Sequence, residues 1–415
     1  MSTTDRLHAL DAVRAFALLL GVVFHAGFSF LPGLPSGIWA MVDSSPSVAI
    51  GTVLYVSHMF RMSLFFLIAG FFARMMFHRR GARGFWVDRG KRILVPLVAG
   101  WPVIAPLLGV IWVWGPRKSF GDAPPTLPIQ LPPPPAAAFQ LTHLWFLYYL
   151  LILYALVTGV RTAAVALDRG GAIRRVVDTI VGRLVRSGAA ALVLPLPLIA
   201  AFLALPTWFM SFGIPTPDQS LIPQLVSLVG YGTAIAFGWL AHRQLDLLHT
   251  WARLWPIHLG GAVAATVACL SILGTLVPLV PAEPGRSTVT YAVCYGVAVW
   301  CWSFAWIGLA VRFMSRANGA VRYIADASYW IYLVHLPLVV AGQVLIAHLP
   351  WHWSVKFPLI LGVSIALMLA SYHYLVRPTF IGQILNGRRH PRRPAGMDPL
   401  NDVSNGWSSS GRRST

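Results

Sequence analysis

An arginine and a histidine stand eleven residues apart in the first apolar stretch of the chain, residues 6–30. In an α-helix this spacing is about three turns, or roughly 16 Å of rise, so Arg14 and His25 point the same way at different depths. Gly21 lies between them on that face and would admit a neighbouring helix or a thin ligand. Arginine binds phosphates and carboxylates, and histidine can take a proton from a hydroxyl at neutral pH. The pair predicts an anion site and a general base. The alternative is an Arg14 that reaches the membrane interface and a His25 that only packs.

A second histidine and arginine pair occurs in SHMFRM, where His58 and Arg61 are one helical turn apart. Rise arithmetic places Arg61 at roughly the depth of His25. Cations inside a membrane helix are costly and seldom face lipid, which makes Arg61 a candidate for function. The alternative is that Arg61 pairs with Asp43 or with a carbonyl and only holds its helix in place.

Three further segments carry candidate residues. THLWFL places His143 and Trp145 at one membrane face, although Trp145 alone fits an interfacial aromatic belt. SYWIYLVH places His335 near mid-membrane with Tyr332 one turn before it, and His335 alone is interpreted as a packed, hydrogen-bonded histidine. The basic loop expected over residues 74–92 ends in Arg89 and Arg92. Together with Arg14, these arginines would hold the phosphates of a donor; the alternative is a topology anchor beside anionic lipid.

The residue types that are scarce in this chain restrict the reactions that it could catalyse. The chain has a single glutamate, Glu283, and no carboxylate in the interior of an expected span, which argues against a proton-coupled transporter. It has no GxSxG or HExxH motif and no phosphate-binding loop, and its three cysteines show no disulfide or metal spacing. Imidazole chemistry with arginine clamps remains, and it suits acyl transfer from a phosphorylated donor to a hydroxyl.

The composition predicts the elements that must position these residues. With 57% hydrophobic and 11% charged residues among 415, the chain is predicted to be an all-α polytopic membrane protein rather than a soluble one. Few of the 32 Lys and Arg residues fall in alternate loops, which places both termini in the cytoplasm, and we assign the +19 charge to topology rather than to nucleic acid. Ten spans are expected, at about 9–31, 52–77, 92–115, 142–161, 188–207, 222–242, 256–280, 288–312, 324–347 and 356–377.

The spans form one expected membrane domain over residues 1–386, followed by a disordered basic cytoplasmic tail over 387–415. The first apolar run is too long for a cleavable signal. Residues 161–186 have the pattern of an amphipathic helix lying along the membrane surface. Residues 115–140 are rich in proline and are predicted to form an extended lid or spacer on the outer face.

These residues resemble those of the acyltransferase-3 family of integral-membrane acyltransferases. The resemblance consists of the spacing from Arg14 to His25, the RGKR segment ending at Arg92, and SYWIYLVH, and it covers residues 6–380. HMFRMSLFFLIAGFFA, LTHLWFLYYLLIL and ASYWIYLVHLPLVV are most similar to the glucans biosynthesis protein C group. The resemblance implies a ten-helix inner-membrane enzyme with His25 as its catalytic histidine. It further implies an acyl-CoA co-substrate, succinyl-CoA or acetyl-CoA, no bound cofactor, and the hydroxyls of a periplasmic glucan or other polysaccharide as acceptor.

Our interpretation is therefore a membrane O-acyltransferase. We expect His25 as general base, Arg14, Arg61, Arg89 and Arg92 on the donor side, and His58, His143, Trp145, Tyr332 and His335 on the acceptor side or in support. A succinyl group ends in a carboxylate that a buried Arg61 would pair with, which gives the hypothesis that Arg61 selects a dicarboxylic acyl group. The alternatives are an O-acetyltransferase of lipopolysaccharide or exopolysaccharide, and a glycan transporter without acyl transfer. The sequence leaves open what orients His25 and whether an acyl-enzyme forms.

Overall fold

The structure is a computed structural model that describes residues 3–35, 37–120, 139–205, 208–274, 283, 285–316 and 318–387. Within these ranges the chain forms helices and no β-strand, which confirms the all-α prediction. Seven helical stretches are long and apolar enough to cross a membrane, or up to eight if one bent pair counts as a single span. One of them, Val48–Lys118, is 71 residues long. The number of ten spans and the side on which the termini lie stay predictions.

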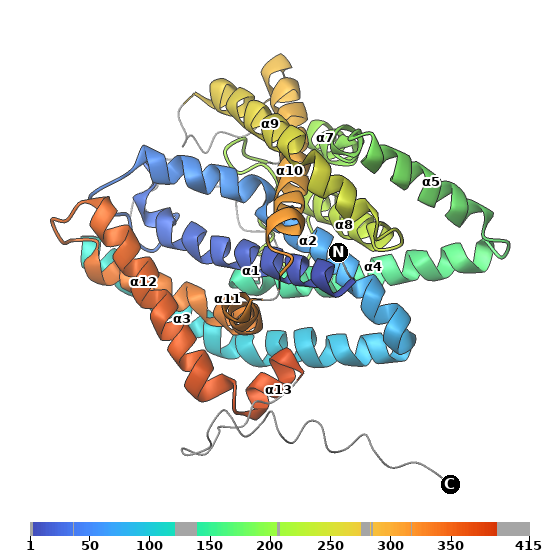
Figure 1. Cartoon of the computed structure of the whole chain (residues 1–415). Coiled ribbons are helices and arrows are strands. Elements are labelled where there is room, and N and C mark those ends of the chain that lie inside the picture. Colours follow the sequence, from blue (N-terminus) through green and yellow to red (C-terminus); the bar gives the residue numbers. More distant parts are fainter. Residues whose placement is uncertain are drawn as a thin grey trace, which may run out of the picture.

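Helix α1 (Thr3–Gly27) runs through the middle of the bundle and carries both Arg14 and His25 (Figure 1). It contacts α2 (Val48–Arg89), α10 (Arg286–Phe313), α11 (Gly319–Ile346) and α12 (Trp353–Ser371). Its buried positions, among them Ala9, Val13 and Ala17, recur at helical spacing and are small enough for close packing. The remaining helices are α3 (Val95–Phe120), α4 (Trp145–Leu167), α5 (Ala172–Arg186), α6 (Ala190–Val193), α7 (Leu196–Ala204), α8 (Leu225–Ala241), α9 (Leu247–Leu273) and α13 (Phe380–Asn386).

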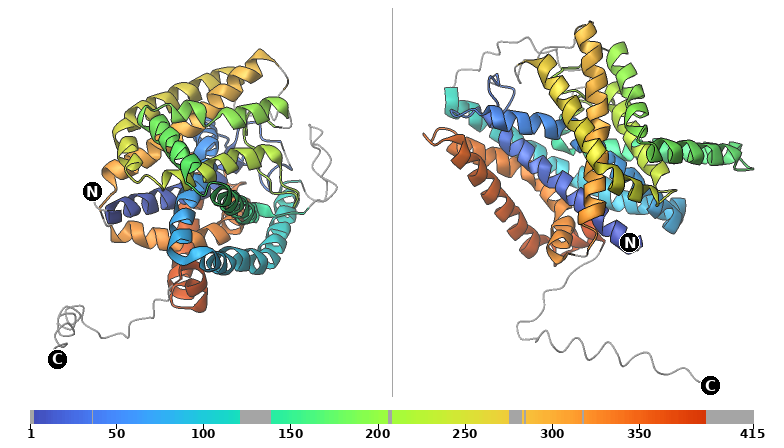
Figure 2. Two further views of the ribbon diagram at one scale, coloured as in Figure 1. Left: turned by 90° about the vertical axis from the view of Figure 1, so that its right-hand side faces the viewer. Right: turned by 45° about the horizontal axis from the view of Figure 1, so that its top comes forward.

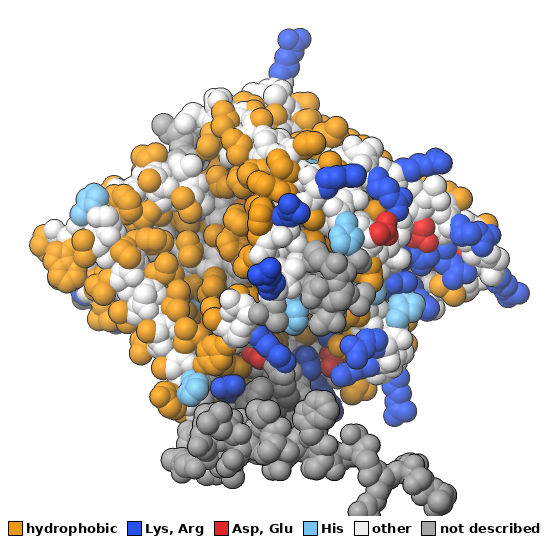
Figure 3. Space-filling view, viewed as in Figure 1, with side chains coloured by type: hydrophobic (Ala, Val, Ile, Leu, Met, Phe, Trp, Pro, Cys, Tyr) orange, Lys and Arg blue, Asp and Glu red, His pale blue; other side chains and the backbone are white. Residues whose placement is uncertain are grey.

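The outward faces of the peripheral helices are apolar. Val98, Val103 and Val110 on α3 and Val263 and Val267 on α9 are exposed. Exposed valines at helical spacing are costly in water and ordinary against lipid tails. Figure 3 shows hydrophobic side chains over much of one face, with Lys and Arg side chains gathered mainly toward the side that carries α5. This arrangement is that of a multi-pass membrane protein.

Glycines bring α2 and α8 into backbone contact. A Cβ atom built on Gly238 would lie 1.9 Å from the carbonyl oxygen of Leu67, and one on Gly70 would lie 2.0 Å from that of Ile235. Neither position has room for a side chain, so the two helices touch through their backbones as membrane helices with small interfacial residues do. The close contact fixes the depth at which α2 holds Arg61.

The structure corrects two of the expected loops. Residues 74–92, predicted as a basic loop, are helical: α2 continues to Arg89 across a break at Gly81 (φ 67°, ψ 176°), and a π-helical turn, η2 (Gly90–Leu94), leads into α3. The helix persists because Phe77 and Phe85 on it are buried in the bundle. In the proline-rich segment 115–140, the residues up to Phe120 belong to α3, and 121–138 lie outside the described residues.

Helix α5 is the amphipathic segment predicted between the fourth and fifth spans. It is bent by 104° from the following helical stretch, Ala190–Ala204, and projects from the body of the bundle (Figure 2). The predicted amphipathic helix is confirmed over Ala172–Arg186, whereas residues 161–167 of the predicted segment belong to α4. Its position along a membrane surface stays a prediction. Of the expected tail, residues 388–415 lie outside the described residues.

A buried ion pair joins the segment after α1 to α12. The Lys356 Nζ atom lies 3.0 Å from Asp43 Oδ1 and 2.8 Å from the Ala347 carbonyl, and the two side chains are 0% and 1% exposed. Asp43 Oδ1 also accepts a hydrogen bond from the Ser45 amide. The alternative interpretation that Arg61 pairs with Asp43 is thus wrong, because Lys356 takes that place.

Lys356→Met should destabilise the protein by about 3–5 kcal/mol, because it leaves the Asp43 carboxylate buried without its cation. Adding Asp43→Asn should recover most of the loss, since the amide keeps an oxygen for the Ser45 amide and carries no charge. Thermal unfolding followed by tryptophan fluorescence in detergent measures both. Equal instability of the single and double variants would contradict a coupled pair.

Candidate active site

All ten residues predicted for the site line one cavity of about 1770 Å³. The cavity follows α1 from Asp11 to Phe28, which is about 25 Å of helix at 1.5 Å per residue. We call the end of the bundle that carries Arg14, Arg89 and Arg92 the basic end. The structure thus brings together residues from α1, α2, α4 and α11 that lie more than 300 positions apart in the sequence. The ten residues are Arg14, His25, His58, Arg61, Arg89, Arg92, His143, Trp145, Tyr332 and His335.

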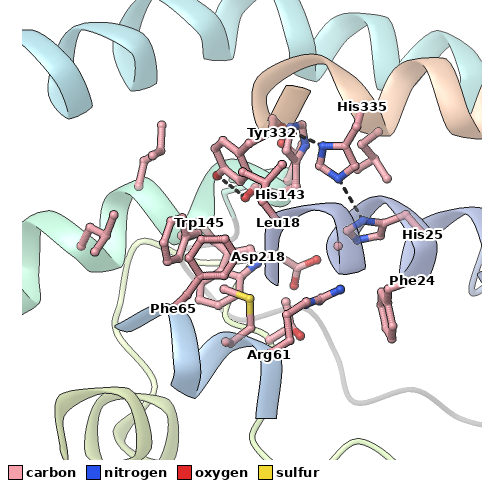
Figure 4. Close-up of a pocket in the computed structure, with 18 of the residues that line it drawn as sticks. Leu18, Phe24, His25, Arg61, Phe65, His143, Trp145, Asp218, Tyr332 and His335 are labelled. Carbon is pink, nitrogen blue, oxygen red and sulfur yellow. Dashed lines mark hydrogen bonds between the residues drawn. The ribbon is translucent and has the colours of Figure 1, made fainter. Parts of the chain in front are cut away.

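His25 lies in the last turn of α1 and faces His335 across the cavity (Figure 4). The His25 Nδ1 and His335 Nε2 atoms are 3.0 Å apart, and His335 Nδ1 is 2.7 Å from the Tyr332 carbonyl oxygen. The group that orients His25, which the sequence left open, is a second imidazole rather than a carboxylate. His335 is indeed packed and hydrogen-bonded, and its partner is the candidate base.

Gln343 fixes the backbone that carries His25. Its side-chain amide donates to the carbonyl oxygens of His25 at 2.8 Å and of Ala26 at 3.0 Å, and its Oε1 accepts from Trp39 Nε1 at 2.8 Å. The last carbonyls of a helix have no partner within the helix, and in a membrane interior water does not replace it. Gln343 supplies that partner. Sequence reasoning missed it, although an amide within an apolar span was the available signal.

His143 approaches α11 from the start of α4. Its Nε2 atom is 3.0 Å from the Leu333 carbonyl oxygen, and the Tyr332 hydroxyl donates to the His143 carbonyl at 2.7 Å. The neighbouring Trp145 ring stacks on Tyr231, with centroids 5.6 Å apart, and is buried rather than placed at an interface. These contacts hold both residues of the THLWFL segment against the cavity wall.

Arg61 is a buried cation without a carboxylate partner. Its side chain is 6% exposed, and its Nε and Nη1 atoms have no hydrogen-bond partner among the described residues. The guanidinium lies 4.4 Å from the centroid of the Phe24 ring, and His58 stacks on the same ring with centroids 5.2 Å apart. A Cβ atom on Gly21 would lie 3.8 Å from Nη1, so a larger side chain there would fill the space beside the guanidinium. This geometry makes the Arg61 guanidinium available to an anion in the cavity that His25 also lines.

Arginines at the basic end converge on one carboxylate. Asp88, which is buried, accepts from Arg89 at 2.6 Å and from Arg80 at 3.0 Å, and it lies 3.3 Å from Arg92. The Tyr329 hydroxyl donates to the Arg92 carbonyl oxygen, and Arg14 lies 3.3 Å from Asp11. One buried carboxylate leaves this cluster net positive, as a phosphate site requires. Asp88 was not among the predicted residues, although it precedes Arg89 directly.

The loop before α8 lines the cavity near its other end. Asp218 in this loop accepts the Leu141 amide at its carbonyl oxygen at 2.7 Å, and its carboxyl group points into the space that His25 and Arg61 also face (Figure 4). Burial raises the pKa of the Asp218 carboxyl to about 6. Asp218 was likewise missed, because nothing in the sequence places this loop beside α1 and α2.

Within the described parts of the chain, no group of three His, Cys, Asp or Glu side chains is arranged to hold a metal ion. What the cavity offers is an anion-binding cluster at the basic end, a hydrogen-bonded pair of imidazoles farther along α1, and a free guanidinium between α1 and α2. This combination can hold a phosphorylated molecule, take up a proton and bind a second negative charge.

Comparison with known protein families identifies one that matches most of the chain. The acyltransferase domain family matches residues 7–373. Glucans biosynthesis protein C of Escherichia coli O6:K15:H31 is 30% identical over 159 residues, which cover 37% of this chain and 38% of that protein. The proteins of the same name are 29% identical in Shigella dysenteriae over 154 residues (37% and 38%) and in Salmonella paratyphi B over 157 residues (38% and 39%). The alignments span less than half of these relatives. No solved structure matches the chain.

The fold and the site define a multi-pass membrane protein whose helix bundle encloses a largely apolar cavity with arginine and histidine side chains in its wall. The chain belongs to the acyltransferase domain family, which spans nearly all of the described residues and confirms the resemblance drawn from the sequence.

Asp218→Asn should raise thermal stability above pH 6 and leave it unchanged near pH 4. The folded protein keeps the Asp218 proton up to about pH 6, whereas the unfolded chain releases it near its ordinary pKa of 3.8. The free energy of unfolding of the wild type therefore falls as the pH rises between these values, and the amide removes that fall. Tryptophan fluorescence followed during heating in detergent, which works at both pH values, measures the transition.

Asp246→Asn is the control, because that carboxylate is 61% exposed and pairs with Arg186 at the surface. It should show no comparable gain above pH 6. An Asp218→Asn effect of the same size at pH 4 and pH 7.5 would mean that burial of the charge is not its cause.

Proposed function

We propose that this protein is an O-acyltransferase of the bacterial inner membrane that moves an acyl group, succinyl in our proposal, from acyl-CoA to hydroxyls of a periplasmic glucan. The observation that carries the proposal is the single cavity that joins the arginines of the basic end to the histidines around His25. Family membership supports the acyl transfer, and the name of the curated relatives supports the glucan. In this proposal the basic end faces the cytoplasm.

The arginines of the basic end would hold the phosphates of acyl-CoA. Guanidinium groups bind phosphate oxygens through two parallel hydrogen bonds, and Asp88 keeps Arg89 and Arg92 turned toward each other. Arg14, about three turns into α1, lines the same cavity. The pantetheine arm of acyl-CoA, which joins these phosphates to the thioester, would then extend along α1 toward His25.

The proposed reaction moves the acyl group from the sulfur of CoA to a hydroxyl oxygen of the acceptor. The hydroxyl oxygen of the acceptor attacks the thioester carbonyl carbon while His25 takes the hydroxyl proton, so the new C–O bond forms as the base is protonated. The C–S bond breaks, and the proton passes from the His25 ring to the leaving sulfur, giving free CoA thiol and the ester. A route through an acyl group on His25 has the same overall balance.

Arg61 supports a dicarboxylic acyl group. A guanidinium that is buried without a counter-ion destabilises the empty site, and a carboxylate bound there would relieve that cost. The phosphates of the donor have their own arginines at the basic end. We therefore assign the carboxylate that would pair with Arg61 to the acyl group beside His25, as in succinyl-CoA.

Purified wild-type protein should release CoA thiol from succinyl-CoA, and a glucan oligosaccharide should raise the rate. His25→Gln should lower the glucan-dependent rate by at least about 100-fold, because the amide keeps the shape and accepts no proton. A thiol assay in nanodiscs measures both. If folded wild-type protein consumes no acyl-CoA with any acceptor, the acyltransferase proposal fails and a glycan transporter becomes the better interpretation.

Arg61→Gln should change which donor is preferred. The variant should lose at least about tenfold in kcat/KM with succinyl-CoA and little with acetyl-CoA, because only the former carries a carboxylate to pair with Arg61. Arg253→Gln, at an exposed position on α9, removes an arginine outside the cavity and serves as the control. If the ratio of the two donors is unchanged by Arg61→Gln, Arg61 does not select the acyl group.

A further inference from the structure

Three histidines meet around one turn of α11. The rings of His25 and His143 each lie 5.0 Å from the ring of His335, measured between centroids. All three line the cavity, and two carbonyl oxygens of the same turn, those of Tyr332 and Leu333, accept hydrogen bonds from two of the rings. Because a carbonyl oxygen only accepts, these two bonds determine where the ring hydrogens are.

The first hydrogen bond determines the tautomer of His143. Pro337 has no N–H group, so the Leu333 carbonyl four residues earlier lacks its helical donor. His143 Nε2 lies 3.0 Å from that oxygen and supplies the missing hydrogen. In a neutral imidazole the other nitrogen is then a bare acceptor. The His143 Nδ1 atom is buried and has no hydrogen-bond partner among the described residues, and His143 as a whole is only 7% exposed.

The second hydrogen bond determines the tautomer of His335 and, through it, that of His25. His335 Nδ1 must carry a hydrogen to donate to the Tyr332 carbonyl at 2.7 Å, so in the neutral ring Nε2 is an acceptor. The only donor that this geometry allows for the 3.0 Å contact is then His25 Nδ1. His25 therefore keeps its hydrogen on Nδ1 and its lone pair on Nε2.

We propose that the turn of α11 before Pro337 presets these tautomers so that two imidazole lone pairs, on His25 Nε2 and His143 Nδ1, bind two hydroxyl groups of one sugar residue of the acceptor. The inference rests on the proposed acyl transfer and names what its acceptor site recognises. One hydroxyl gives its proton to His25 Nε2 as it attacks the thioester, and the other only donates a hydrogen bond to His143 Nδ1. A monohydroxyl compound satisfies one lone pair and leaves the other buried without a partner.

His335 is a positioning residue in this arrangement. It touches neither substrate, and it holds His25 in the tautomer whose Nε2 is free. When His25 takes the hydroxyl proton, its Nδ1 hydrogen stays bonded to His335 Nε2, so no rearrangement is needed before the proton moves to the leaving sulfur. The arrangement has the logic of a histidine oriented by a hydrogen-bond acceptor in other acyl-transfer sites, with a neutral ring as the acceptor.

His143→Gln tests the hydroxyl site. The glutamine amide can still donate to the Leu333 carbonyl, but it places no lone pair at the Nδ1 position. The KM for a glucan oligosaccharide should rise about tenfold, the loss of one hydrogen bond, while the KM for acyl-CoA changes less than about twofold. An unchanged KM for the glucan would overturn the proposed site at His143.

A matched pair of variants tests His335. His335→Leu removes the acceptor for His25 and should lower kcat about 100-fold or more with KM for both substrates nearly unchanged, whereas His335→Gln offers Oε1 in its place and should recover at least about tenfold of the loss. A residue that only fills space would give the reverse order, since leucine suits an apolar helix interior better than glutamine. Gel-filtration profiles identify variants that fail to fold.

Nitrogen-15 NMR of histidine-labelled wild-type protein tests the tautomer without any assay of activity. The His25 signals, assigned by their loss in His25→Gln, should show hydrogen on Nδ1 and an unprotonated Nε2. Hydrogen on Nε2 instead would overturn the inference even if acyl transfer is observed. The converse result, the expected tautomer with no consumption of acyl-CoA, would retain the preset geometry and reject the proposed reaction.

Discussion

The hydrogen bond between His25 and His335 joins the two helices on which the site depends. Helix α1 ends inside the protein, and its last carbonyl oxygens would be unpaired there without Gln343, which comes from the same helix, α11, as His335. One face of α11 thus satisfies both the backbone and the side chain of His25. Because neither lipid nor an apolar core can substitute for these partners, the register of α1 against α11 is fixed by polar contacts in surroundings that are otherwise hydrophobic.

The second constraint is a positive charge that the fold does not neutralise. Asp43, the carboxylate nearest to Arg61 in the sequence, pairs with Lys356, and Asp88 pairs with three arginines. Among the described residues Arg61 forms no ion pair, and its guanidinium lies over the face of the Phe24 ring in the cavity that the Asp218 carboxyl also enters. Backbone contact between α2 and α8 through glycine holds the cation in place despite its cost. The protein therefore holds a cation that can bind an anion in the part of the cavity that His25 faces.

Much of this site was predictable from the sequence because its signals are local. Arg14 and His25 share a face by helical spacing alone, and the apolar runs with their basic flanks define a membrane bundle. Two of the residues that were missed, Asp218 and Gln343, gain their roles from segments far away in the sequence, which no periodicity encodes. Asp88 pairs with arginines close to it in the sequence, and it was missed because the segment was expected to be a loop. The basic stretch before Arg92 was misassigned because its charge outweighed the two buried phenylalanines that keep it helical.

The long cavity beside α1 has a consequence for the membrane as an electrical barrier. A membrane sustains a voltage and an ion gradient only while no continuous water-filled passage crosses it. The apolar side chains of Leu18, Met62 and Phe65 form part of the cavity wall. The hydroxyls of Tyr329 and Tyr332 in the same wall are already engaged as donors to the carbonyl oxygens of Arg92 and His143. A cavity lined in this way can hold a molecule without offering ions a continuous polar path.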